Sequence, residues 1–146
     1  MFDSSIDVAA KAVDEATAIR ATIGGALQAW ARGDGRTYAA SFTPDCSDIA
    51  FFGVCRDGRA ANAELHGALF HCAAKRAAMR DNIDAIEWLC GEVALVRTAS
   101  FGPVAGYQTY VMVKRDGAWL IRSFQHTPVD RLTSWVAGVW RDRVRG

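Results

Sequence analysis

The chain has 146 residues, 51% hydrophobic and 23% charged, and its 17 basic and 16 acidic residues leave a formal net charge of +1. This length suits one globular domain that buries enough surface to fold without disulfides or a structural metal. The near-neutral charge argues against a nucleic-acid-binding protein or one that binds anionic membranes. We therefore expect a small molecule or another protein as the partner.

The start of the chain and its cysteines are typical of a cytoplasmic protein. Residues 1–15 carry Asp3, Asp7, Asp14 and Glu15 and no continuous apolar stretch, so they do not form a signal peptide. No apolar run is long enough to predict a membrane span. The four cysteines have neither a C-x-x-C pair nor histidines at zinc-finger spacing, and we expect them to be reduced and mostly buried.

Apolar residues at helical spacing come first in the chain: Ile19, Ile23, Leu27 and Trp30. They predict a helix over residues 8–32, which Gly33 ends. Asp34 is then expected to cap a second, short helix over residues 38–42. Two helices therefore precede any strand.

Strand-forming residues follow over 46–52, and residues 53–59 predict a tight reversal into a short second strand. Helical spacing returns over residues 60–74. Four further strands, separated by glycine-containing turns, are expected at 83–90, 93–101, 107–115 and 119–127. This order predicts an α+β domain whose helices pack on one face of a curved antiparallel sheet.

The last residues, 129–146, form a separate segment. Leu132, Trp135 and Val139 recur at helical spacing with arginines off that stripe, which predicts an amphipathic C-terminal helix. This helix packs on its own sheet or on a partner subunit, or it binds a membrane surface. The chain is thus divided into a domain over 1–128 and a helical tail.

Five short motifs then occur in an order found in a known family. They are Ala29-Trp30-Ala31-Arg32-Gly33-Asp34, Phe42-Thr43-Pro44-Asp45, Gly53 with Asp57-Gly58-Arg59, Gly117-Ala118-Trp119-Leu120-Ile121, and Phe124-Gln125-His126-Thr127-Pro128. Over about residues 12–128 the chain resembles the SnoaL-like, nuclear transport factor 2-like superfamily, and most of all its SgcJ/EcaC branch. The resemblance implies a cystatin-like cone of three helices and a strongly curved sheet that enclose an apolar pocket. It also implies a homodimer packed through the outer sheet face.

The catalytic residues of ketosteroid isomerases, which the chain resembles only distantly, have no counterparts here. The positions of their Tyr and Asp fall at about Ala26 and Ala50, so that chemistry is not expected. Asp48 is the nearest substitute, because strand alternation places it on the same face as Ala50. The alternative for Asp48 is an exposed carboxylate at the start of the strand.

His66 lies in the third predicted helix. On the inner face of that helix it would overhang the pocket and act as an acid or a base. The alternative is a core histidine held by a backbone hydrogen bond. His71 lies about 140° further round the helix, so the two histidines cannot share a metal ion, and no metal site is expected.

The last predicted strand has two faces, with Gln125 on one and His126 on the other, and either face could line the pocket. Aromatic residues distributed over the helix and strands would wall a pocket for a flat apolar ligand. The ligand-binding candidates are Tyr38, Phe52, Trp88, Tyr110, Gln125 and His126.

Three functions remain open. The first is a dimeric binding protein that encloses a hydrophobic, aromatic or polyketide-like small molecule. The second is a cofactor-independent isomerase, cyclase or dehydratase that uses Asp48 and His66 as acid and base. The third is a protein-binding module that uses the outer sheet face and the tail. The sequence has no phosphate loop, dinucleotide fingerprint or nucleophile elbow, so no cofactor is expected.

Overall fold

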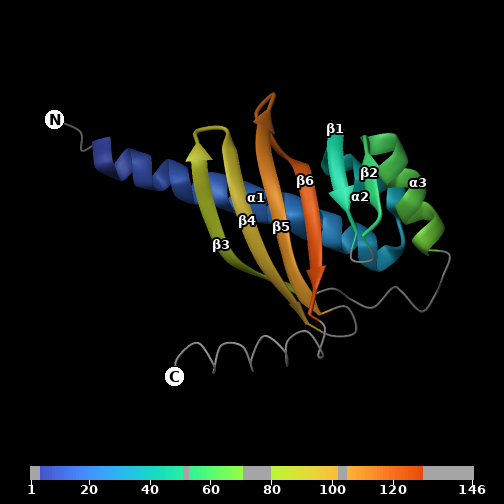
Figure 1. Cartoon of the computed structure of the whole chain (residues 1–146). Helices are drawn as coiled ribbons and strands as arrows, with labels where there is room; N and C mark the ends of the chain where they lie inside the picture. Colours follow the sequence, from blue (N-terminus) through green and yellow to red (C-terminus); the bar gives the residue numbers. More distant parts are fainter. Residues whose placement is uncertain (1–3, 51–52, 71–79, 102–104, 130–146) are drawn as a thin grey trace, which may run out of the picture.

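The computed structural model describes residues 4–50, 53–70, 80–101 and 105–129. In chain order the elements are α1 (Ser4–Arg32), α2 (Gly35–Ala40), β1 (Phe42–Ile49), β2 (Cys55–Asp57), α3 (Arg59–Phe70), β3 (Arg80–Cys90), β4 (Val93–Phe101), β5 (Gly106–Arg115) and β6 (Ala118–Pro128). Helix α1 crosses one face of the sheet, and α2 and α3 pack beside β1 and β2 (Figure 1). The predicted C-terminal helix lies outside the described residues.

The six strands form one sheet in the order β2-β1-β6-β5-β4-β3. Neighbouring strands are antiparallel except β1 and β6, which run parallel, so the sheet is mixed and not wholly antiparallel as the sequence predicts. Asp116 and Gly117, between β5 and β6, have φ angles of 51° and 80°, as a type I′ hairpin turn requires. The expected α+β class, with three helices packed on a curved sheet, is confirmed.

Strand β1 begins earlier than the sequence predicts. It starts at Phe42, which the prediction assigns to the end of the second helix, and it includes Pro44. Its pairing with β6 shifts register between Phe42 and Ser47, so Pro44 lies where no ladder hydrogen bond is needed. Strand β2 also precedes Gly58 instead of following it, and Gly58, with φ of 88°, leads into α3.

Helix α1 packs its predicted stripe against the sheet. Ile19, Ile23 and Trp30 are buried in one cluster with sheet residues such as Met112. Glu15 accepts hydrogen bonds from Lys114 Nζ and Trp119 Nε1, each at 2.5 Å, which ties α1 to the β5–β6 hairpin. No helix among the described residues combines the length and the apolar surface that a membrane span requires.

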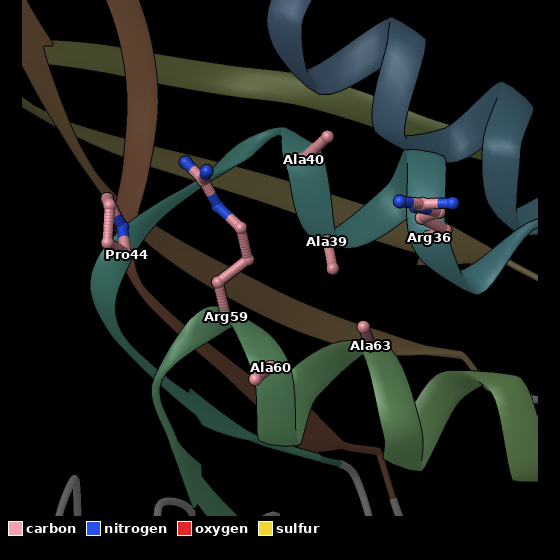
Figure 2. Close-up of a pocket in the computed structure, with 7 residues that line it drawn as sticks. All are labelled: Arg36, Ala39, Ala40, Pro44, Arg59, Ala60 and Ala63. Atoms are coloured by element: carbon pink, nitrogen blue, oxygen red, sulfur yellow. The ribbon is translucent and has the colours of Figure 1, made fainter.

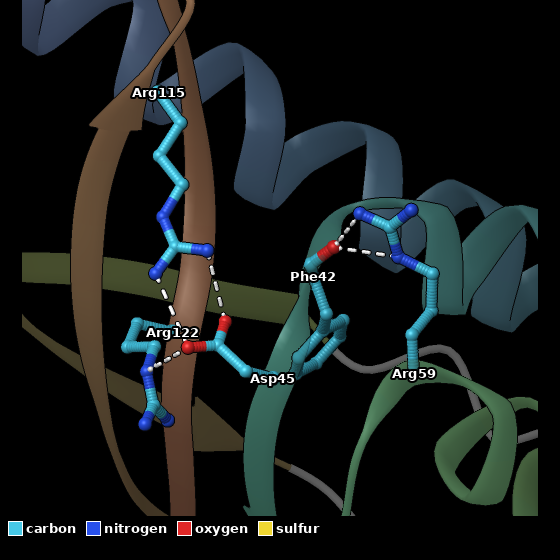
Figure 3. Close-up of polar contacts among 5 residues, drawn as sticks. All are labelled: Phe42, Asp45, Arg59, Arg115 and Arg122. Carbon is cyan, nitrogen blue, oxygen red and sulfur yellow. Dashed lines mark hydrogen bonds and ion pairs between the residues drawn. The ribbon is translucent and has the colours of Figure 1, made fainter.

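Polar contacts hold β1 between the β5–β6 hairpin and α3 (Figure 3). Asp45 accepts a hydrogen bond from Arg115 Nη1 at 2.9 Å, and its Oδ2 lies 3.4 Å from Arg122 Nε. On the other side, Arg59 Nε donates to the Phe42 carbonyl at 2.8 Å. These contacts fix the placement of the strand that carries Asp48.

The cysteines differ from the expectation that most are buried. Cys46 is buried on β1, but Cys55 and Cys90 are exposed. The reason is their position at the two sheet edges: Cys55 lies on β2, whose three residues are all exposed, and Cys90 ends the other edge strand, β3. Cys72 lies outside the described residues.

Candidate acid–base site

Three polar side chains meet inside the domain. Asp48 on β1 is 0% exposed, and Asn62 and His66 on α3 are 0% and 2% exposed. Residues four apart lie on one face of a helix, so Asn62 and His66 both face Asp48. Asp48 is therefore an interior residue, as strand alternation with Ala50 allows, and not an exposed carboxylate.

Asn62 links the two titratable side chains. Its Nδ2 donates to Asp48 Oδ2 at 2.7 Å, and its backbone carbonyl lies 2.9 Å from His66 Nδ1. A carbonyl only accepts, so Nδ1 carries the hydrogen and Nε2 of the neutral ring holds the lone pair. His66 Nε2 lies 3.9 Å from Asp48 Oδ2. The basic nitrogen therefore faces the carboxyl group.

Burial shifts both groups toward their neutral forms. Desolvation raises the pKa of Asp48 to about 7, although the hydrogen bond from Asn62 lowers it. Desolvation also lowers the pKa of His66 to about 4, although the hydrogen bond to the Asn62 carbonyl raises it. Between these two pKa values a protonated carboxyl group faces a neutral imidazole. Such a pair has both a proton to give and a site to receive one.

Aromatic rings from the first two helices enclose His66. The ring centroid of Tyr38 on α2 lies 4.3 Å from that of His66, and Trp30 on α1 lies 5.4 Å away. Tyr38 also contacts Phe42 at 5.1 Å. These rings exclude water from the imidazole, which explains why desolvation dominates its pKa.

The last strand turns His126, and not Gln125, toward the interior. Ile121, Phe124 and His126 are all buried, although strict alternation would place Ile121 and Phe124 on opposite faces. The pairing of β6 with β5 shifts register at this point and leaves Arg122 as an extra residue. Such a bulge moves the following side chains to the other face of the strand.

A second buried polar cluster surrounds Gln108 on the inner sheet face. Its Oε1 accepts from Thr98 Oγ1 at 2.6 Å, its Nε2 donates to Ser100 Oγ at 2.7 Å, and Nε2 lies 3.4 Å from His126 Nδ1. Desolvation lowers the pKa of His126. The sequence does not predict this cluster, because alternation on β5 shows which face Gln108 occupies but not its partners.

The remaining predicted ligand-binding residues have different surroundings. Tyr110 is buried on the inner face, as Tyr38 is beside His66. Trp88 is 39% exposed, and Gln125 is exposed on the outer face of β6. Phe52 lies outside the described residues. The structure thus brings Tyr38, Tyr110 and His126 to the interior with the acid–base pair, but not Trp88 or Gln125.

A separate hollow of about 490 Å³ lies between α2 and α3 (Figure 2). Its lining is mostly small and apolar with two arginines: Arg36, Ala39, Ala40, Pro44, Arg59, Ala60 and Ala63. Neither Asp48 nor His66 lines it, because α3 turns Arg59 and Ala63 to this hollow and His66 to the interior. The hollow is not part of the acid–base site.

No protein-family model and no curated protein matches the chain. Solved structures do match it. An NTF2-like protein with a cystatin-like fold from Novosphingobium aromaticivorans has a TM-score of 0.74 and 17% identity, covering 90% of this chain and 93% of that one. A domain of unknown function with a cystatin-like fold from Nostoc punctiforme has a TM-score of 0.73 and 23% identity, covering 86% and 85%.

A third match bears on the candidate chemistry. It is a ketosteroid isomerase-like protein from Erwinia carotovora atroseptica, with a TM-score of 0.69 and 19% identity, covering 78% of this chain and 95% of that one. Ala26 and Ala50, where the sequence analysis places the isomerase Tyr and Asp, are buried apolar residues here. At these identities the likeness shows the fold, and the chain has the cystatin-like α+β fold of NTF2-like proteins.

Proposed function

We propose that the chain encloses a hydrophobic, aromatic or polyketide-like small molecule and acts on it as a cofactor-independent isomerase, cyclase or dehydratase. Asp48 exchanges protons with the ligand, and His66 exchanges protons with Asp48. The observation that carries this proposal is the fully buried Asp48 carboxyl, whose pKa is raised to about 7 and which lies 3.9 Å from His66 Nε2. The motif order supports a place in the SgcJ/EcaC branch of the SnoaL-like proteins.

The burial of this pair supports a functional role over a structural one. Removing ionisable groups from water costs free energy, and apolar side chains of similar size would avoid that cost. Asp48 also keeps one oxygen, Oδ1, to which no described residue donates a hydrogen bond. Strongly shifted pKa values in such surroundings are concentrated at functional sites.

The geometry divides the work among three residues. At neutral pH a carboxyl group with a pKa near 7 is present in both forms, so it can take a proton from an acidic carbon and return it. Asn62 holds Oδ2, which leaves Oδ1 for the ligand. His66 Nε2 carries no proton at this pH, because the pKa of His66 is lowered to about 4, and it lies 3.9 Å from Oδ2, where it can receive the carboxyl proton. The surrounding rings of Trp30 and Tyr38 keep bulk water away from this exchange.

Exchange of carbon-bound hydrogen for deuterium tests the proposal without knowledge of the natural substrate. The protein is incubated in D₂O with a panel of flat ketones and phenols, and deuterium incorporation is followed by NMR. We expect Asp48→Asn to lower the exchange rate by at least about 100-fold and His66→Gln to lower it less. Asp57→Asn, at an exposed carboxylate on β2, is the matched control and should leave the rate unchanged.

An exchange rate that Asp48→Asn does not alter would contradict this assignment. Absence of exchange with every compound, together with tight binding of some, would favour the second candidate, a binding protein without a reaction. That candidate rests on the buried aromatic contacts, such as Tyr110 with Phe124 at 4.9 Å, which suit the wall of a binding site.

We also propose a homodimer through the outer sheet face. Leu89 and Tyr107 are large apolar residues exposed on the sheet, and burial against a second copy would remove them from water. Light scattering should give the mass of a dimer for the wild type and of a monomer for Tyr107→Glu. A monomeric wild type at micromolar concentration would rule the dimer out.

A further inference from the structure

Two fully buried oxygen atoms at the acid–base site have no hydrogen-bond donor among the described residues. They are Asp48 Oδ1 and Asn62 Oδ1, and both side chains are 0% exposed. The hydrogen bond between Asn62 Nδ2 and Asp48 Oδ2, at 2.7 Å, uses one atom of each group and leaves these two. The two unpaired oxygens therefore belong to the two side chains that this hydrogen bond joins.

Neither side chain can turn toward another donor without breaking this bond. Asn62 lies near the start of α3, where its backbone N–H donates to the Gly58 carbonyl at 3.1 Å, and Asp48 is fixed within β1, which pairs on both sides. Buried polar atoms are nearly always hydrogen-bonded, because an unpaired one loses the bond that it made in water. A group from outside the described residues must therefore complete the pair.

The chemistry of the two oxygens restricts that group. Asn62 Oδ1 only accepts hydrogen bonds. Asp48 Oδ1 accepts when the carboxyl is ionised. When the carboxyl is protonated, the hydrogen lies on Oδ1 and donates, since Oδ2 accepts from Asn62. Because Asp48 has a pKa of about 7, both forms occur at neutral pH.

A hydroxyl group completes the pair when Asp48 is protonated, because its oxygen accepts the hydrogen on Asp48 Oδ1 while its own hydrogen is donated to Asn62 Oδ1. An ether or ketone oxygen only accepts, so it leaves Asn62 Oδ1 unpaired. A carboxylate anion is repelled by both oxygens when Asp48 is ionised. A neutral group that both donates and accepts therefore fits this pair when Asp48 is protonated.

We propose that Asp48 Oδ1 and Asn62 Oδ1 form a hydroxyl-binding pair, and that the ligand of this site is an uncharged alcohol or phenol. Asn62 is then a ligand-binding residue as well as the group that orients Asp48. This inference rests on the proposed function, because it assigns the chemical class of the ligand at the same site.

Matched compounds that differ only in the hydroxyl hydrogen test the inference. Phenol is compared with anisole, and 2-naphthol with 2-methoxynaphthalene, by NMR titration of the full chain. We expect each hydroxyl compound to bind at least about tenfold more tightly than its methyl ether, because the ether leaves a buried acceptor unpaired. In the wild type, the Asn62 side-chain NH₂ signals should shift with phenol and less with anisole.

Asn62→Leu should remove the preference, so that each phenol and its ether bind equally. Asn82→Leu, at an exposed asparagine on β3, is the matched control and should keep the preference. Should Asn62→Leu fail to fold, the wild-type comparison and its Asn62 signals still decide the question.

Equal or tighter binding of the ethers would overturn the inference. That result is expected if a retained water molecule, and not the ligand, occupies the site beside the two oxygens. Absence of binding by all four compounds at about 1 mM would overturn it too. A hydroxyl preference without deuterium exchange would leave the hydroxyl-binding pair standing and end the catalytic proposal. Deuterium exchange without a hydroxyl preference would leave the catalytic proposal standing and end the hydroxyl-binding pair.

Discussion

Asp45 and Asp48 lie on the same strand, yet their pKa values are shifted in opposite directions. Asp45 is exposed, and the hydrogen bonds that Arg115 donates to it lower its pKa to about 2. Asp48 is fully buried, and desolvation raises its pKa to about 7. Surroundings, and not residue type, therefore decide that Asp45 stays charged and fastens β1, whereas Asp48 takes up a proton at neutral pH.

The largest effect is expected when one member of the buried pair, Asp48 or His66, is removed and the free energy of unfolding is followed against pH. The folded-state pKa of Asp48 lies above its ordinary value of 3.8, so its contribution to stability falls as pH rises toward 7. The folded-state pKa of His66 lies below 6.5, so its contribution rises with pH from about 4. In the wild type the two slopes cancel between pH 4 and 6.5.

Single variants should expose the two slopes. Asp48→Asn leaves only His66, and the free energy of unfolding should rise by up to about 1.4 kcal/mol per pH unit in this window. His66→Gln leaves only Asp48, and the free energy should fall at a similar rate. Urea denaturation at several pH values measures both. Variants whose slopes have the same sign would contradict the opposed shifts.

A smaller effect is expected from crowding the helices that carry the buried pair. A Cβ atom at Gly35 on α2 would lie 2.7 Å from the backbone nitrogen of Gly67 on α3, next to His66. Gly35→Ala should therefore destabilise the protein by about 1–3 kcal/mol and change the pKa of Asp48, but not that of Asp45.

Gly24→Ala is the control for this variant, because a Cβ atom there meets nothing within 4 Å. It should raise stability by up to about 1 kcal/mol through helix propensity alone. Thermal unfolding of both variants checks the pair of predictions, and a stabilising Gly35→Ala would show that α2 and α3 do not approach so closely.

The smallest effect is expected at the exposed member of the comparison. Asp45→Asn removes an ion pair in water, and such pairs contribute little to stability. Because the pKa of Asp45 is lowered, its contribution to the free energy of unfolding is present at neutral pH and is lost as pH falls toward 2. The melting temperatures of Asp45→Asn and wild type should therefore converge in acid. A gap that widens in acid would contradict this account.

Local patterns predicted most of the helices and strands. The stripe from Ile19 to Trp30 and the Asp116–Gly117 turn are signals carried by neighbouring residues, and both match the structure. The early start of β1 and the bulge at Arg122 could not be predicted from the pattern of neighbouring residues. Both depend on pairing with a distant strand, β1 with β6 and β6 with β5.

The same distinction applies to the candidate site. Strand alternation and the helical stripe placed Asp48 and His66 on candidate inner faces, because each pattern is local. The role of Asn62 and the cluster around Gln108 were missed, since their hydrogen bonds join different elements. A pattern within one element shows which face a polar residue occupies but not which partner it finds there.

The proposed acid–base pair requires a protonated Asp48 beside a neutral His66, and NMR titration of the Asp48 carboxyl carbon and the His66 ring nitrogens measures both protonation states. We predict that Asp48 takes up its proton near pH 7 and that His66 stays neutral down to about pH 4. An Asp48 carboxyl that titrates below 3.8, beside a His66 that titrates above 6.5, would reveal an ion pair and contradict the proposal of a neutral acid–base pair.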